Sequence, residues 1–213
     1  MKIISVTAQK GGVGKSSVAL NLAGQAELQK EWKVAIVDTD TKQRSLTKWA
    51  QFREKEQPLI CAFDPEQDSL SEFIEGAKND GFDLLIFDTP PHHTSLISEV
   101  ARTATFSVVV CEPAIFDIFA IEDTVTMLSN LNARFKVLFN SSPAKRNGLE
   151  DADVRDCRRY LEAENAPLFR ETIAARKPVK HAQTAFMLIN EYEPRGQAAK
   201  EISAVWKELE KEL

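Results

Sequence analysis

A glycine-rich stretch near the start of the chain constrains the fold more than any other part of the sequence. Residues 9–16 read Gln-Lys-Gly-Gly-Val-Gly-Lys-Ser, after an apolar run at 3–6 and before apolar residues at helical spacing. Such a loop between a strand and a helix is typical of phosphate binding. Its glycines let successive N–H groups point at one anion, and the helix N-terminus adds its dipole. The sequence therefore predicts a phosphate-binding loop here.

The residue types within this loop suit a nucleotide with a bound metal ion. Lys15 brings positive charge to the β- and γ-phosphates, and the Ser16 hydroxyl can ligate Mg²⁺. The loop backbone and the first helical turn supply the remaining contacts. We expect the nucleotide to be held by Gly11, Gly12, Val13, Gly14, Lys15, Ser16 and Ser17.

Short apolar runs alternate with helical patterns along the whole chain. Further runs span residues 34–37, 59–63, 82–87, 106–111 and 135–139, residues 167–169 are a candidate short strand, and a last helical pattern covers 197–213. Strands that alternate with helices are the signature of a mostly parallel sheet covered on both faces. We predict one α/β domain over residues 1–213: a single-domain P-loop NTPase with a twisted, mostly parallel sheet flanked by helices on both faces.

Polar residues follow several of these predicted strands. Asp38 and Asp40 follow the second run, Asp88 the fourth and Asn140 the sixth. Ligands of open parallel sheets bind at the carboxyl ends of the strands, so these side chains should meet the loop at one edge. Asp88 is then placed to hold Mg²⁺ opposite Ser16, directly or through water. Asn140 is the candidate adenine contact, since its amide both donates and accepts; an ordinary turn asparagine is the alternative.

The loop resembles the deviant Walker A motif, x-K-G-G-x-G-K-[ST], of the ParA/MinD superfamily of ATPases. Gln9 stands where the ordinary motif has its first glycine, and Lys10 is an additional lysine. In that family the extra lysine contacts nucleotide bound to the facing subunit. The resemblance therefore implies a homodimer that forms on ATP, with Lys10 and Lys15 acting on the phosphates. A solvated loop lysine is the alternative for Lys10.

Other segments resemble the same family. The resemblance of Asp38-Thr39-Asp40 to its first switch implies that Asp40 orients the attacking water and that Asp38 supports the metal. The usual Asp-Pro-Gln sequel is absent, because residues 40–43 read Asp-Thr-Lys-Gln. Residues 89–91, Thr-Pro-Pro, resemble the second switch. Asp117, which follows Pro113, resembles an aspartate near the dimer face, and the resemblance implies that it contributes to nucleotide binding; capping of a helix is the alternative.

The resemblance is closest to the small, ParF-like plasmid partition ATPases, which lack an N-terminal helix-turn-helix. It implies a Mg²⁺-dependent, partner-stimulated ATPase that dimerises on ATP and binds DNA non-specifically. Such a protein distributes a plasmid, a chromosome or other cargo through a ParB-like or other cargo-linked adaptor. It would be cytoplasmic, and nucleoid-associated when ATP is bound.

A MinD-like ATPase that works on a membrane surface is the main alternative. It needs a basic amphipathic C-terminal helix, whereas residues 200–213 carry four glutamates. No run of about 18 apolar residues occurs, so we expect no stable membrane insertion. An electron-transfer iron protein with a related loop would need paired cysteines for its cluster, whereas Cys61, Cys111 and Cys157 are widely spaced. A related bacterial tyrosine kinase would carry a tyrosine-rich tail, and the chain has 2 tyrosines.

Charge is distributed unevenly along the chain. The net charge is −5, yet residues 134–181 contain eleven Lys or Arg against seven Asp or Glu. Non-specific DNA affinity comes from clustered cations that neutralise phosphates, so it does not require a basic total. The alternative is that these charges are simply solvated. The DNA-binding candidates are Arg170, Arg176, Lys177 and Lys180.

Overall fold

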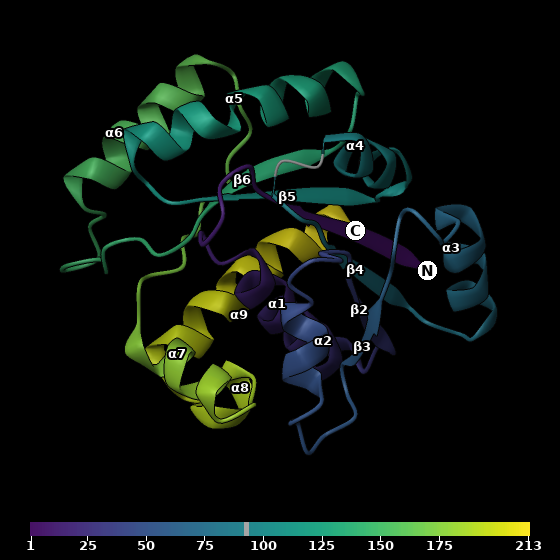
Figure 1. Ribbon diagram of the computed structural model, residues 1–213. Coiled ribbons are helices and arrows are strands. Elements are labelled where there is room, and N and C mark those ends of the chain that lie inside the picture. Colours follow the sequence, from purple (N-terminus) through teal and green to yellow (C-terminus); the bar gives the residue numbers. More distant parts are fainter. Residues whose placement is uncertain (92–93) are drawn as a thin grey trace.

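The computed structural model describes residues 1–91 and 94–213, and it confirms the α/β fold (Figure 1). The strands are β1 (Lys2–Thr7), β2 (Val34–Asp38), β3 (Leu59–Ala62), β4 (Leu84–Asp88), β5 (Phe106–Cys111) and β6 (Phe135–Phe139). In the described part of the chain they form a six-stranded sheet in the order β3-β2-β4-β1-β5-β6. Every neighbouring pair in this sheet is parallel.

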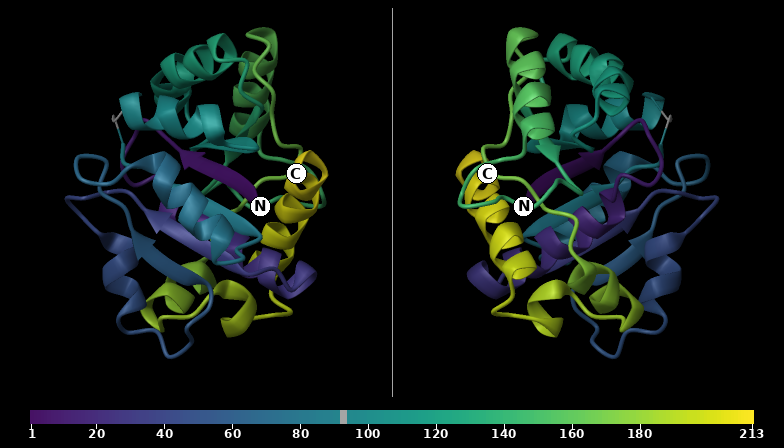
Figure 2. Two further views of the ribbon diagram at one scale, coloured as in Figure 1. Left: turned by 90° about the vertical axis from the view of Figure 1, so that its right-hand side faces the viewer. Right: turned by 90° about the vertical axis from the view of Figure 1, so that its left-hand side faces the viewer.

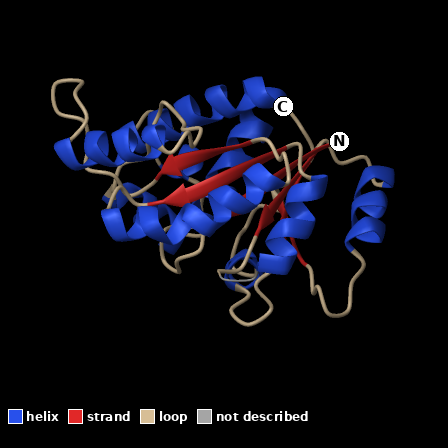
Figure 3. Ribbon diagram, turned by 90° about the horizontal axis from the view of Figure 1, so that it is seen from above, coloured by secondary structure: helices blue, strands red, loops and turns tan. Residues whose placement is uncertain are grey.

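Helices cover both faces of the sheet (Figures 1 and 2). One face carries α1 (Lys15–Lys30), α2 (Ser45–Ala50), α7 (Lys177–Thr184), α8 (Ile189–Tyr192) and α9 (Gln197–Leu209), which ends in a 3-10 turn, η1 (Glu210–Glu212). The other face carries α3 (Leu70–Asn79), α4 (Thr94–Thr103), α5 (Ile115–Asn130) and α6 (Ala152–Ala163). Seen from above, the sheet lies between these two helical layers (Figure 3).

The inner strands are apolar throughout because both of their faces are buried. Ile36 and Val37 are neighbours in β2 and both are 0% exposed, yet they belong to clusters on opposite faces of the sheet. Successive residues of a strand point to opposite faces, so a strand covered on both sides reads as a continuous apolar run. This is why the sequence pattern located these strands.

The last helix completes the layer beside α1. Its residues Ile202, Val205, Trp206 and Leu209 are buried in the same core cluster as α1. The predicted apolar stripe therefore packs inside the protein. None of the described helices has the length and apolar character needed to cross a bilayer.

Two local predictions were wrong. Residues 167–169 form no strand: Leu168 makes an isolated bridge to Val137, flanked by hydrogen bonds from Val137 N to Pro167 O and from Phe169 N to Val137 O. Pro167 has no N–H to extend the ladder. Asp117 is not a helix cap, because α5 begins at Ile115 and Asp117 lies within its first turn.

Candidate nucleotide-binding site

The glycine-rich loop joins β1 to α1 in the conformation that an anion site requires. Gly14 has φ 86° and immediately precedes α1, which begins at Lys15. A Cβ at Gly14 would collide with the side-chain amide of Asn140, so strain and crowding both favour glycine. Asn140 in turn donates from Nδ2 to the Val13 carbonyl at 2.7 Å. The end of β6 thus supports the loop from one side.

The loop and the strand ends enclose a cavity of about 300 Å³. The predicted aspartates converge here because β2, β4 and β1 are parallel neighbours that end at one edge. Gln183 of α7 also lines this cavity, and no motif in the sequence marked it. The walls comprise Gly11, Gly12, Gly14, Lys15, Ser16, Ser17, Asp38, Asp40, Gln43, Ser45, Asp88, Thr89, Pro91 and Gln183.

Ser16 and Asp88 form a donor set that fits Mg²⁺. The Ser16 hydroxyl donates to Asp88 Oδ2 at 2.5 Å. The other oxygen, Oδ1, is buried and has no hydrogen-bond partner among the described residues. Burial raises the pKa of Asp88 to about 7, against the opposing effects of Ser16 and Lys15. Mg²⁺ prefers oxygen ligands, and a carboxylate oxygen beside a hydroxyl provides them. A bound Mg²⁺ would also give the buried Oδ1 of Asp88 the partner that it lacks.

Asp38 organises the first switch in this conformation. Its Oδ2 accepts from the backbone N–H of Thr47 at 2.9 Å and from the Thr47 hydroxyl at 3.0 Å. Its Oδ1 accepts from Asp40 N at 3.3 Å. Oδ2 therefore binds the first turns of α2, and Oδ1 binds the backbone of Asp40 before that helix. Asp38 would reach a metal ion through water or after releasing one of these donors.

Asp40 closes the turn that replaces the expected Asp-Pro-Gln sequence. Its Oδ1 accepts from Lys42 N at 3.2 Å and from Gln43 N at 2.9 Å. These bonds hold the carboxylate at the wall of the cavity, although the proline is absent. The substituted turn therefore still presents Asp40 to the site.

The two lysines of the loop occupy different environments. Lys15 is 8% exposed, and burial lowers its pKa against the attraction of Asp88 and Asp40. The Lys10 side chain is 55% exposed, and its Nζ lies 3.0 Å from Asp117 Oδ1 in the first turn of α5. The sequence analysis placed Lys10 and Asp117 separately near a dimer face and did not predict the ion pair between them.

A second cavity of about 550 Å³ adjoins the first and shares Gly12, Gly14, Ser17 and Gln183 with it. Asn140 lines it, as predicted for an adenine contact. Nδ2 of Asn140 donates one of its two hydrogens to the Val13 carbonyl, so its second N–H and Oδ1 remain for a contact to a base. The lining also includes Ile173, Ala174, Ala175, Arg176, Lys177, Val179 and Lys180.

Long-range ion pairs remove much of the positive excess predicted for residues 134–181. Arg176 binds Glu201 of α9 through Nε and Nη2, with the shortest contact at 2.6 Å. Lys136 and Arg134 pair with further glutamates at the end of the chain. The segment count omitted these carboxylates, so it overestimated the positive excess of the folded protein, and Arg176 is paired with Glu201 in this structure. Arg170, Lys177 and Lys180 are exposed and form no ion pair with the described residues.

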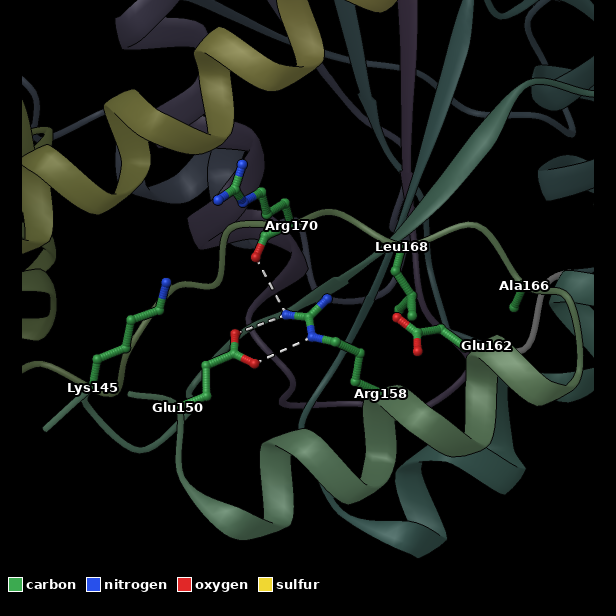
Figure 4. Close-up of a pocket in the computed structure, with 7 residues that line it drawn as sticks. All are labelled: Lys145, Glu150, Arg158, Glu162, Ala166, Leu168 and Arg170. Atoms are coloured by element: carbon green, nitrogen blue, oxygen red, sulfur yellow. Dashed lines mark hydrogen bonds and ion pairs between the residues drawn. The ribbon is translucent and has the colours of Figure 1, made fainter. Parts of the chain in front are cut away.

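A third cavity, of about 450 Å³, lies beside α6 (Figure 4). Its central cation, Arg158, is neutralised by Glu150 and also donates to the Arg170 carbonyl at 3.3 Å. Arg170 turns its guanidinium away from Arg158, as Figure 4 shows. Its central arginine is thus already paired, and the cavity shares no lining residue with the cavity that holds the aspartates.

Comparison with known proteins identifies the family. The model described as the CobQ/CobB/MinD/ParA nucleotide binding domain matches residues 4–212. The chain belongs to this family. The superfamily resemblance found in the loop is thereby confirmed for nearly the whole chain.

Individual relatives agree with this assignment. The maintenance of carboxysome distribution protein A of Gloeobacter kilaueensis is 27% identical over 220 residues, which span 100% of this chain and 94% of that protein. The MinC:MinD cell division protein complex of Aquifex aeolicus matches with a TM-score of 0.76 at 18% identity, over 99% of this chain and 96% of that one. The McdA–ATP complex of Cyanothece matches with a TM-score of 0.71 at 16% identity, over 100% and 96%. The two structural matches establish the shared fold.

Proposed function

We propose that this protein is a Mg²⁺-dependent ATPase that positions cargo, dimerises on ATP and is stimulated by an adaptor protein. The observation that carries the proposal is the convergence of Lys15, Ser16, Asp40 and Asp88 on one cavity at the carboxyl edge of the sheet. Phosphoryl transfer needs mainly positioning and charge from the protein, and this set provides both.

Each side chain has a distinct task in hydrolysis. The loop N–H groups and the start of α1 bind the phosphates, and Lys15 balances their charge. Ser16 and Asp88 would hold Mg²⁺, which neutralises charge that develops on the transferring phosphoryl group. Asp40 orients the attacking water from the cavity wall. No strong base stands among these wall residues, so turnover by the protein alone should be slow.

Replacement of Lys15 tests the assignment. Lys15→Ala should lower ATP turnover by at least about 100-fold, because a buried charge at the phosphates is lost. Lys48→Ala, which changes an exposed lysine on α2, is the control and should leave turnover unchanged. Phosphate release measured with both proteins decides the matter. Wild-type turnover by Lys15→Ala would refute the assignment.

Fewer observations support DNA as the surface to which the ATP-bound protein binds. Lys177 and Lys180 lie on α7, which also walls the second cavity, so nucleotide and a basic surface share one element. Arg170 is the third candidate. As for cargo, the name of the Gloeobacter relative favours a carboxysome-like body carried over the nucleoid in the cytoplasm, ahead of a plasmid or chromosome. α9 packs its apolar side inside the protein, and α9 with η1 carries four glutamates, so the end of the chain gives no support to a membrane surface.

A further inference from the structure

The two cavities beside the glycine-rich loop meet at Gln183. The first contains Lys15 and Ser16, and the second contains Asn140. The residues that line both cavities are Gly12, Gly14, Ser17 and Gln183. Three of them belong to the loop and to the first turn of α1. Within the described part of the chain, Gln183 of α7 is therefore the one junction residue that another element supplies.

The sugar of a bound nucleotide would lie at this junction. In ATP the ribose connects the phosphates to the base. The phosphates belong in the first cavity, beside Lys15 and Ser16, and we predict the base in the second, at Asn140. A nucleotide that occupies both cavities therefore passes its ribose, with two adjacent hydroxyl groups, between them.

The side-chain amide of Gln183 suits the hydroxyl groups of this sugar. An amide has an acceptor oxygen and an NH₂ donor, so it can pair with two neighbouring hydroxyls, whereas the loop N–H groups only donate and suit phosphate oxygens. Gln183 is half-buried, and among the described residues its hydrogen bonds all use its backbone. A half-buried amide without a partner has lost hydrogen bonds to water, which a ligand would replace.

Contacts from α2 hold the backbone of Gln183 in place. Nε1 of Trp49 donates to the Gln183 carbonyl at 2.8 Å. The Trp49 ring also packs against that of Phe186, with 6.3 Å between the ring centroids. Arg53 Nη1 donates to the Phe186 carbonyl at 3.2 Å. These contacts fix the end of α7 against α2, which lies on the same face of the sheet (Figure 1).

We propose that Gln183 determines sugar specificity. Its amide accepts a hydrogen bond from one ribose hydroxyl and donates to the other, and Trp49 is the positioning residue that holds it at the junction. The inference rests on the nucleotide binding proposed above and goes beyond it, because neither phosphate binding nor hydrolysis requires recognition of the sugar. A site that pairs with a hydroxyl discriminates against the analogue that lacks it, because the amide is then left unpaired.

Calorimetric titration with the Mg²⁺ complexes of ADP, 2′-deoxy-ADP and 3′-deoxy-ADP tests the inference. These diphosphates report binding without turnover. The wild type should bind each deoxy analogue about fivefold more weakly than ADP, which corresponds to one hydrogen bond. Gln183→Ala should bind all three nucleotides with equal affinity. Alanine is a strong helix former, so α7 should persist, and measurable ADP binding also shows that the variant folds.

Two further variants make the test specific. Gln43→Ala removes a matched amide from a residue that lines the first cavity but not the second, and it should keep the fivefold preference of the wild type. Trp49→Phe keeps an aromatic ring against Phe186 but removes the N–H that binds the Gln183 carbonyl. We expect it to reduce the preference to about twofold, because the amide is held less firmly.

The outcomes separate this inference from the proposed function. Wild-type protein that binds no Mg-ADP refutes the nucleotide site, and the inference with it. Equal affinity of the wild type for all three nucleotides refutes sugar recognition and leaves the nucleotide site intact. A preference that persists in Gln183→Ala, or one that Gln43→Ala loses as fully, overturns the role of Gln183. A full preference in Trp49→Phe overturns the positioning role of Trp49.

Discussion

Replacing Glu191 should destabilise the protein in a pH-dependent way. This carboxylate in α8 receives both Nη atoms of Arg53, each at 2.8 Å, and the ammonium of Lys55 at 3.1 Å. It also accepts from Leu188 N at 2.8 Å. The Arg53 side chain is 3% exposed and that of Glu191 13%. The pair ties α8 to the segment between α2 and β3.

The magnitude follows from the pKa of Glu191. Burial alone would raise it, but the hydrogen bonds from Arg53, Leu188 N and Lys55 outweigh burial and lower the pKa from 4.5 to about 2. A shift of this size corresponds to ~3 kcal/mol, which partial exposure and solvent screening reduce to ~1–2 kcal/mol. The folded pKa lies below the unfolded one. The stabilisation is therefore complete above about pH 5 and is lost as pH falls through 4.5 toward 2.

Urea unfolding of the wild type and of Glu191→Gln at pH 7 and pH 3 measures this effect. Glu191→Gln should lower the free energy of unfolding by ~2–3 kcal/mol at pH 7, because Arg53 is left buried without its counter-charge. The difference in free energy of unfolding between the two proteins should shrink by about half at pH 3, because the wild type has by then lost much of the stabilisation from the charged Glu191. Glu193→Gln, at an exposed residue just past α8, is the control. An equal loss at both pH values would refute the electrostatic explanation.

Two further predictions concern the nucleotide cycle and DNA. Asp40→Ala should retain ATP binding but slow ATP turnover by about 100-fold, because the attacking water is no longer positioned. Light scattering of this variant in ATP should then show a long-lived dimer, and a mass equal to that in ADP would contradict the prediction. The double variant Lys177→Glu/Lys180→Glu should abolish ATP-dependent gel shifts of unrelated DNA sequences at low salt, whereas Lys78→Glu on α3 should not; unchanged binding would remove α7 from the DNA surface.

The sequence alone determined the fold class and most of the phosphate site. The glycine-rich loop is a contiguous motif, and the buried strands are contiguous apolar runs, so local order was sufficient to locate them. The convergence of Asp38, Asp40 and Asp88 also followed, because parallel strands necessarily end at one edge. None of this required knowledge of side-chain packing. The roles in hydrolysis that we assign to these aspartates remain predictions.

Only the tertiary structure decided how the charges are paired. Lys10 meets Asp117, and Arg176 meets Glu201, across 107 and 25 residues of chain. A count of charges along one segment cannot include carboxylates that arrive from a helix elsewhere in the fold. The exposure of Ile115, Phe116 and Phe119 was hidden for a similar reason, since α5 is apolar on both sides at its start and the sequence pattern does not say which side is covered. Packing selects the partner of each exposed or charged group, and packing depends on the whole chain.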